Sequence, residues 1–121
     1  GLNTATGEGW GLPNFEHAAA GKAQVVPRFG ALAEIWSECA EFVEPETEVV
    51  YEVVLSEGRA VSPKKVAAAL EKLYRDRAHR ELVAAACHQR VMRPEFKWEN
   101  IGKRWHQVFA EVLVDRQGRK E

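Results

Sequence analysis

The first 45 residues alternate between helix-forming and strand-forming segments, and this alternation constrains the fold more than any other feature. A glycine-rich loop opens the pattern, and short helices and short apolar strands then follow in turn. The expected order is loop 5–12, helix 14–20, strand 23–26, helix 31–36 and strand 41–43. Alternating helices and strands are typical of an α/β fold with a parallel sheet, whose buried strands read as apolar runs. We therefore expect an α/β part over residues 1–45.

The pattern changes after residue 45, where strand-like composition gives way to long helical stretches. Residues 48–55 are rich in valine, Ser56-Glu57-Gly58 is typical of a turn, and Arg59-Ala60-Val61 can return as a partner strand. A β-hairpin is therefore predicted over residues 46–62. It would be followed by C-terminal helices over 63–121, within one partial domain of 1–121.

Three helices are predicted in the C-terminal part. Ser62 followed by Pro63 is typical of a helix start, which predicts a helix to Arg75. Further helices are expected over 78–92 and 97–115, separated by Pro94. Their apolar stripes are expected to face a core: Val66, Ala69, Leu70 and Leu73; Leu82, Val83, Ala86 and Cys87; and Trp98, Ile101, Trp105, Val108 and Val112.

Charge and composition narrow the classes of function. The formal net charge is −1, whereas a protein that binds nucleic acid through phosphate contacts is usually basic, so no nucleic-acid partner is expected. No run approaches the roughly 20 apolar residues of a membrane-spanning helix. Cys39 and Cys87 are too few and too far apart for a disulfide framework or a cysteine-rich zinc site. These observations favour a cytoplasmic location.

The start of the chain favours a piece of a larger protein. The chain does not begin with methionine, and Gly1-Leu2-Asn3-Thr4 reads as the end of a buried strand that enters a loop. We therefore expect a C-terminal fragment that carries only part of the function.

Two glutamates on either side of the glycine-rich loop are the main chemical feature. Gly9 and Gly11 precede a helix that starts near Pro13, and such a helix start offers backbone N–H groups to an anion. A carboxylate would repel phosphate but can accept hydrogen bonds from neighbouring hydroxyl groups. Glu8 and Glu16 would therefore bind hydroxyls on both sides of an anion, which is the layout of a nucleotide sugar.

The segment Glu8-Gly-Trp-Gly-Leu-Pro-Asn-Phe-Glu16 resembles the E-x7-E motif of retaining glycosyltransferases with the GT-B fold, in particular glycosyltransferase family 4. Gly21-Lys-Ala-Gln-Val-Val-Pro27 and Phe29-Gly-Ala-Leu-Ala-Glu-Ile35 are similar to that family's next turn and strand and to its glycine-containing loop and helix. Glu95 to Ile101, with Trp105, is similar to the closing helix. The resemblance covers almost the whole chain, and the hairpin is its least typical part. It implies the C-terminal portion of a Rossmann-like parallel-sheet domain.

The resemblance also implies roles for individual residues. Glu8 would contact the transferred hexose and is the expected catalytic residue, while Glu16 would bind the ribose hydroxyls. Backbone N–H groups of the segment between them would bind the sugar and the distal phosphate. That segment comprises Gly9, Trp10, Gly11 and Leu12. No metal and no further cofactor are expected, because the donor, such as a UDP- or GDP-sugar, is itself a substrate.

The partners expected from the resemblance are a nucleotide sugar and a carbohydrate or glycolipid acceptor. The missing N-terminal part of the same protein would supply an arginine and a lysine for the diphosphate and most of the acceptor site. The fragment alone is therefore expected to be inactive and to self-associate.

Simpler interpretations of the same residues stay open. Glu8 can be a solvated loop residue, and Glu16 can interact only with the helix dipole. Lys97, Lys103 and Arg104 are a solvated helix face, or a peripheral membrane contact if the acceptor is a lipid. The alternative function is a non-catalytic helical module for protein interaction, with the hairpin and the tryptophan-bearing last helix against a partner.

Overall fold

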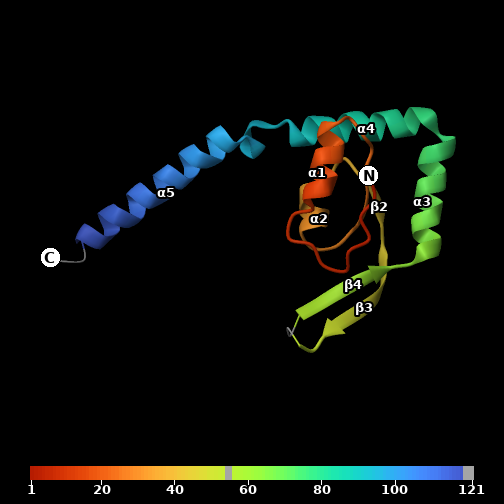
Figure 1. The fold of residues 1–121 in the computed structure, drawn as a ribbon, viewed down its shortest axis with the longest axis horizontal. Helices are drawn as coiled ribbons and strands as arrows, with labels where there is room; N and C mark the ends of the chain where they lie inside the picture. The colour runs from red at the N-terminus through yellow and green to blue at the C-terminus, as the bar shows by residue number, and fades with distance from the viewer. Residues whose placement is uncertain (54–55, 119–121) are drawn as a thin grey trace. The chain divides into compact units, whose positions relative to one another are not determined.

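The computed structural model describes residues 1–53 and 56–118 and forms two compact units, Gly1–Val91 and a second unit that begins at Met92. The first unit is an α/β structure followed by a hairpin and two helices (Figure 1). Its elements are α1 (Leu12–Ala19), β1 (Val25–Pro27), α2 (Gly30–Ile35), β2 (Glu41–Val43), β3 (Pro45–Tyr51), β4 (Ser56–Val61), α3 (Pro63–Arg75) and α4 (Arg77–Val91). The predicted fold class, α/β with a hairpin and C-terminal helices, is confirmed.

A short parallel sheet organises the first unit. Strands β1 and β2 pair in parallel, with Val26 opposite Phe42. Leu2 forms an isolated parallel bridge with Val25 on the other side of β1. The prediction that the first residues are the end of a strand is therefore confirmed at this one bridge, but the expected burial is wrong, since Leu2 is 48% exposed. In Figure 1, β2 lies between α2 on one side and α3 on the other.

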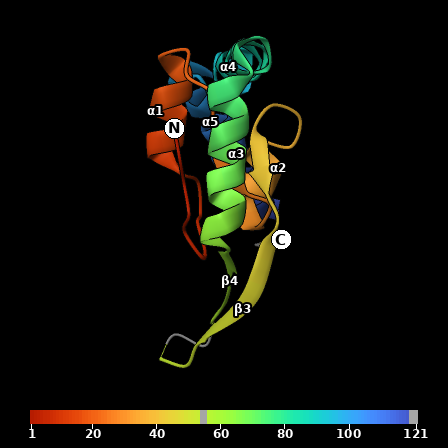
Figure 2. The same cartoon turned by 90° about the vertical axis from the view of Figure 1, so that its right-hand side faces the viewer.

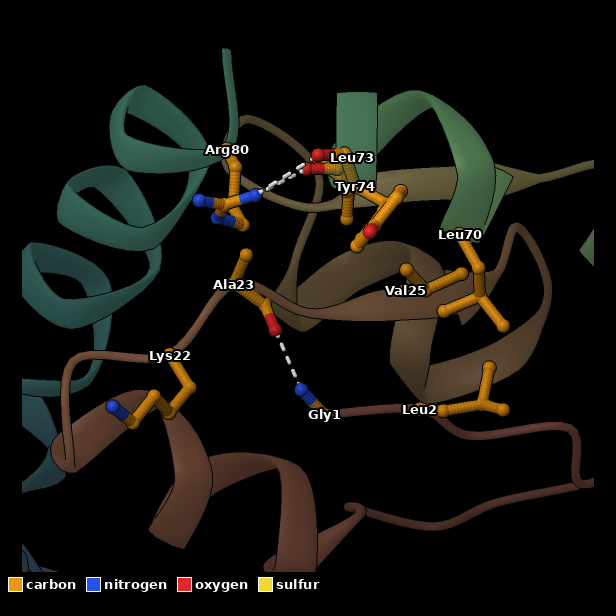
Figure 3. Close-up of a pocket in the computed structure, with 9 residues that line it drawn as sticks. All are labelled: Gly1, Leu2, Lys22, Ala23, Val25, Leu70, Leu73, Tyr74 and Arg80. Carbon is orange, nitrogen blue, oxygen red and sulfur yellow. Dashed lines mark hydrogen bonds between the residues drawn. The ribbon is translucent and has the colours of Figure 1, made fainter. Parts of the chain in front are cut away.

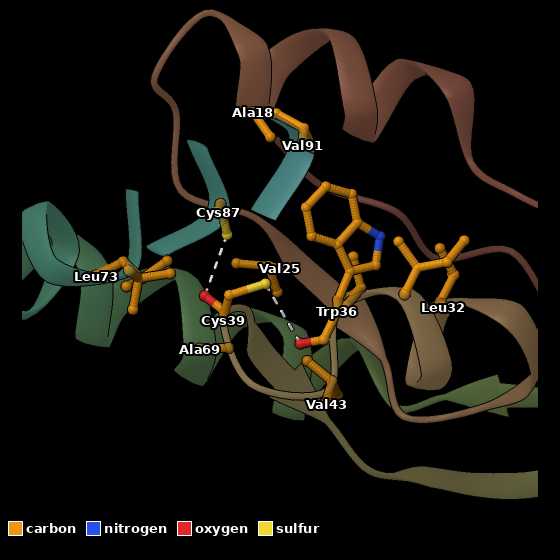
Figure 4. Close-up of a cluster of buried hydrophobic side chains, with 13 residues drawn as sticks. Ala18, Val25, Leu32, Trp36, Cys39, Val43, Ala69, Leu73, Cys87 and Val91 are labelled. Atoms are coloured by element: carbon orange, nitrogen blue, oxygen red, sulfur yellow. Dashed lines mark hydrogen bonds between the residues drawn. The ribbon is translucent and has the colours of Figure 1, made fainter. Parts of the chain in front are cut away.

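The core forms where the helices meet this sheet (Figure 4). Val25, Val26 and Trp36 are almost completely buried, and the Trp36 ring packs against Phe15 of α1. Cys87 from α4 also lies in the core and donates a hydrogen bond from Sγ to the Cys39 carbonyl oxygen (3.1 Å). The interaction with Cys39, together with burial, raises the pKa of the Cys87 thiol. Both cysteines therefore lie in the core, and Cys87 is a neutral thiol there.

The hairpin is present, but its turn was predicted in the wrong place. Ser56 and Gly58 belong to β4, where they pair with Tyr51 and Val49 of β3. The reversal therefore occurs before Ser56, and Val54 and Leu55 lie outside the described residues. Serine and glycine are typical of a turn. An edge strand also tolerates them, and glycine in a strand often marks a place where another backbone segment approaches closely. Figure 2 shows the hairpin projecting beyond the end of α3.

Helices α3 and α4 match their predicted ranges to within one residue, but not every predicted inward residue is buried. Leu73 and Val83 are buried, whereas Leu82 is 70% exposed and Leu70 is 42% exposed. Both leucines lie at the margin of the stripe that packs on the rest of the unit. The prediction that they face a core is therefore wrong within this unit.

An ion-pair cluster ties α3 and α4 to the end of the sheet. The Glu41 carboxylate accepts hydrogen bonds from Lys72 Nζ (2.8 Å) and His79 Nε2 (2.8 Å). Burial alone would raise the pKa of Glu41, but the hydrogen bonds from His79 and Lys72 outweigh it and hold that pKa below its ordinary value. Glu41 therefore stays ionised and joins β2 to both helices.

The second unit consists of a short 3-10 turn, η1 (Pro94–Phe96), and the long helix α5 (Trp98–Gly118). Its apolar stripe is exposed, with Trp98 at 84% and Trp105 at 57%. The prediction that these tryptophans pack in a core is therefore wrong within this unit, where only the 3-10 turn is available for packing. Among the described helices, none is both long enough and apolar enough to cross a membrane.

Candidate functional site

The glycine-rich loop connects the Leu2 bridge to α1, and Gly11 determines how it enters the helix. Gly11 is buried and left-handed (φ 81°), and it precedes Leu12, the first residue of α1. A side chain at this position would be strained, and its Cβ would lie 3.0 Å from Leu32 Cδ2 and 3.3 Å from Asn14 Oδ1. Packing within the protein itself therefore requires glycine at position 11.

Backbone donors gather at the start of α1. The N–H groups of Asn14 and Phe15 both donate to the Gly11 carbonyl oxygen, and Pro13 has no N–H. Among the described residues, nothing accepts a hydrogen bond from the N–H groups of Gly9, Gly11 or Leu12. Gly9 and Leu12 are exposed, so their N–H groups can meet an anion, whereas Gly11 is buried and the N–H groups of Asn14 and Phe15 are already bonded.

The two glutamates lie on different elements and do not bond to each other. Glu8 is half-buried in the loop, where Oε1 is 3.4 Å from the Trp10 backbone nitrogen. Glu16 is exposed one turn into α1, and it has no hydrogen bond or ion pair with any described residue. Glu16 is therefore free to accept hydrogen bonds from a bound molecule, while Glu8 is partly held by its own loop.

The other predicted site residues are partly open to solvent. The Trp10 side chain is 41% exposed and packs against Phe15, with ring centroids 5.3 Å apart. Leu12 is 65% exposed, and Gly9 is exposed. The side chains of Trp10 and Leu12 thus form an open apolar margin beside the available backbone donors.

A chain of side-chain amides, which the sequence analysis missed, links Glu8 to the buried sheet. Asn3 Nδ2 lies 3.5 Å from Glu8 Oε2 and donates to Asn14 Oδ1 (2.9 Å). Asn14 Nδ2 donates to Gln24 Oε1 (2.9 Å), and Gln24 Nε2 donates to the Lys22 carbonyl oxygen (2.8 Å). Asn14 and Gln24 are almost completely buried. Because buried amides must be satisfied, this chain fixes the loop against α1 and β1.

A weak signal for the amide chain exists in the sequence. Asn14 follows Pro13 on the first turn of the predicted helix, and Gln24 interrupts an apolar strand. Polar residues at two positions that are expected to be buried indicate that each has a hydrogen-bond partner. The sequence alone does not identify that partner.

An open pocket beside the Leu2 bridge is a second concave region, shown in Figure 3. Its lining is mostly apolar and comprises Gly1, Leu2, Lys22, Ala23, Val25, Leu70, Leu73, Tyr74 and Arg80. The Arg80 guanidinium already donates to the carbonyl oxygens of Leu73 (2.9 Å) and Tyr74 (3.3 Å). One nitrogen of the guanidinium is therefore already bonded, and the rest of the pocket lining is mostly apolar.

Metal ligands do not gather in the described parts of the chain. No group of three or more histidine, cysteine, aspartate or glutamate side chains in residues 1–53 and 56–118 could hold a metal ion. His88, for example, uses Nδ1 to contact the Ala18 carbonyl oxygen (3.1 Å).

In parallel α/β folds, a loop that leads into the start of a helix is a common place for anionic ligands to bind. Comparison with protein families identifies the family of this chain. The family model described as glycosyl transferase-like matches residues 1–107. The chain therefore belongs to the glycosyl transferase-like family. Among curated proteins, none matches the chain.

Proposed function

We propose that the chain carries part of the donor site of a retaining glycosyltransferase of the GT-B fold, similar to glycosyltransferase family 4. The intact enzyme would move a hexose from a nucleotide sugar to a carbohydrate or glycolipid acceptor on the cytoplasmic side. The observation that carries the proposal is the Glu16 carboxylate, which has no partner among the described residues and lies one turn into α1, after the exposed Gly9 and Leu12. Membership of the glycosyl transferase-like family supports it.

Each group in the loop has a distinct role in this proposal. Glu16 accepts hydrogen bonds from the ribose hydroxyls, and Glu8 from the hydroxyls of the transferred sugar. The N–H groups of Gly9 and Leu12 stabilise the negative charge that develops on the diphosphate as the bond to the sugar breaks. Trp10 covers the apolar face of the bound donor.

Calorimetric titration of the full-length protein with UDP, GDP and ADP tests the proposed donor site. Binding of at least one nucleoside diphosphate, together with slow hydrolysis of the matching nucleotide sugar, is the expected result. Absence of binding to all three would contradict the proposal.

Transfer is expected to continue in excess chelator. The sequence contains no Asp-x-Asp motif, which would offer paired carboxylates to a metal-bound diphosphate. The proposed charge stabilisation comes from backbone N–H groups instead. Activity is measured with and without EDTA, followed by added manganese or magnesium. Complete loss in EDTA that either metal restores would show that this expectation is wrong.

The exposed stripe of α5 favours a second candidate, a non-catalytic module for protein interaction. Trp105 and Phe109 stack with ring centroids 5.4 Å apart, and both side chains are more than half exposed. This candidate predicts no nucleoside diphosphate binding, so the same titration distinguishes the two functions.

A further inference from the structure

The β3–β4 hairpin contacts the glycine-rich loop at Thr6. The Arg59 backbone N–H donates to the Thr6 carbonyl oxygen (2.8 Å), and the Tyr51 hydroxyl hydrogen-bonds to Thr6 Oγ1. Gly58 is buried beside them, and a Cβ added there would lie 2.7 Å from the Thr6 carbonyl oxygen. Two hydrogen bonds and one close approach therefore join the two segments, which are about 50 residues apart in sequence.

The contacted residue lies close to Glu8 in the chain. Thr6 precedes Glu8 by two residues, in the part of the loop between its two anchors. One anchor is Asn3, whose backbone N–H donates to the Val25 carbonyl oxygen (3.0 Å), and the other is the buried Gly11. The hairpin thus supports the loop midway between its ends, where displacement would move the Glu8 carboxylate most.

The hairpin also reaches the second segment beside Glu8. The Arg59 guanidinium lies over the Phe29 ring, 5.5 Å from its centroid. Phe29 precedes Gly30, and a Cβ added at Gly30 would lie 3.8 Å from the Glu8 carbonyl oxygen. The loop at Glu8 therefore lies against the start of α2, and the hairpin contacts both the loop and the residue that precedes α2.

Core packing does not account for the hairpin. Val50 is 68% exposed and Tyr51 is 41% exposed, while Val61, at the base of β4, packs partly against the core. The contacts of Tyr51, Gly58 and Arg59 with the loop therefore help to hold the hairpin in position, together with the ion pair between Glu46 of β3 and Lys65 of α3 (2.9 Å).

We propose that the hairpin is a clamp that positions the glycine-rich loop, and that Tyr51 and Gly58 are positioning residues for Glu8. This inference rests on the proposed function. Because Glu8 faces the sugar in that proposal, the clamp acts on the sugar end of the donor. Glu16, on α1, binds the nucleotide end without it. The clamp therefore affects the use of the intact nucleotide sugar more than the binding of the nucleoside diphosphate.

Tyr51→Phe and Gly58→Ala in the full-length protein test the clamp. Tyr51→Phe removes one hydrogen bond, and we expect kcat/KM for the nucleotide sugar to fall about three- to ten-fold. Gly58→Ala also displaces the Thr6 carbonyl, so its loss is larger, up to about 100-fold. The Kd for UDP, or for whichever nucleoside diphosphate binds, should rise by less than kcat/KM falls, because Leu12 and Glu16 lie on α1, beyond the displaced part of the loop. Amide hydrogen exchange of residues 4–10 becomes faster in both variants.

Matched controls separate the clamp from general destabilisation. Tyr74→Phe removes an exposed hydroxyl from α3, and Gly102→Ala adds a methyl that meets no atom within 4 Å. Both should leave kcat/KM and exchange of the loop unchanged. In Tyr51→Phe combined with Thr6→Val, the two losses should not add, because both remove the same hydrogen bond.

Three results would overturn the clamp. The first is an unchanged rate of amide hydrogen exchange over residues 4–10 in Tyr51→Phe. This result would overturn the clamp even if Gly58→Ala fails to fold. The second is an equal change in kcat/KM and in Kd for the nucleoside diphosphate. The third is additive loss in the double variant. If wild-type protein neither binds a nucleoside diphosphate nor hydrolyses a nucleotide sugar, the proposed function fails, while loop exchange still tests the contact itself.

Discussion

We expect that replacing Glu16 with alanine will raise the KM for the proposed nucleotide-sugar donor about ten- to a hundred-fold, because a charged hydrogen-bond acceptor typically contributes roughly 1.5–3 kcal/mol. The Glu16 side chain is exposed on α1 and bonds to no described residue, so its removal breaks no contact within the protein. Folding stability should therefore stay close to that of the wild type. The measurement is initial-rate kinetics over a range of donor concentration, with thermal unfolding of the same samples.

Glu71→Ala is the matched control, since Glu71 is also an exposed helical glutamate and pairs only with Arg75 of its own helix. Its kinetics should equal those of the wild type. If Glu16→Ala leaves both KM and kcat unchanged, Glu16 interacts only with the helix dipole. A parallel loss of affinity for the free nucleoside diphosphate is also expected, because the ribose belongs to that part of the donor.

Local sequence patterns predicted the elements of the fold well where those elements are buried. The parallel pair is an example, since β2 matches its predicted bounds and β1 differs by two residues at its start and by one at its end. Apolar runs bounded by proline and glycine carry this information. The predicted position of the hairpin turn is wrong because serine and glycine occur both in turns and in strands that closely approach another segment, and Ser56 and Gly58 lie in such a strand.

The candidate site shows a similar division. The sequence locates Gly11 at a helix start and Glu16 one turn into the helix, because both follow from local helical geometry. The amide chain through Asn14 and the hairpin contact at Thr6 depend on segments distant in sequence. Such contacts have no local signature, so only the folded chain reveals them. The stripe of α5 predicts an amphipathic helix correctly, but it does not identify the surface that covers it.

Trp36→Ala is expected to have the largest effect on stability, with a loss of about 3–5 kcal/mol. Trp36 has no exposed surface and lies among Leu32, Val43 and Val91 in the core (Figure 4). Its ring also packs against Phe15, with centroids 5.6 Å apart. Removal of the ring leaves a cavity beneath α1. Because the free energy of unfolding of natural domains is only about 5–15 kcal/mol, a loss of this size removes a large part of the stability.

Trp36→Phe separates ring packing from hydrogen bonding at the same position. Among the described residues, nothing accepts a hydrogen bond from the buried Trp36 Nε1, so phenylalanine loses no such bond. The smaller ring still contacts Phe15, and we expect a cost of less than about 1.5 kcal/mol. Urea unfolding followed by circular dichroism measures both variants. An equal loss in the two would show that the full indole ring system is required, and a small loss in Trp36→Ala would show that the cavity collapses. Because Phe15 also packs against Trp10, the alanine variant should loosen the start of α1 and weaken donor binding as well, whereas the phenylalanine variant should not.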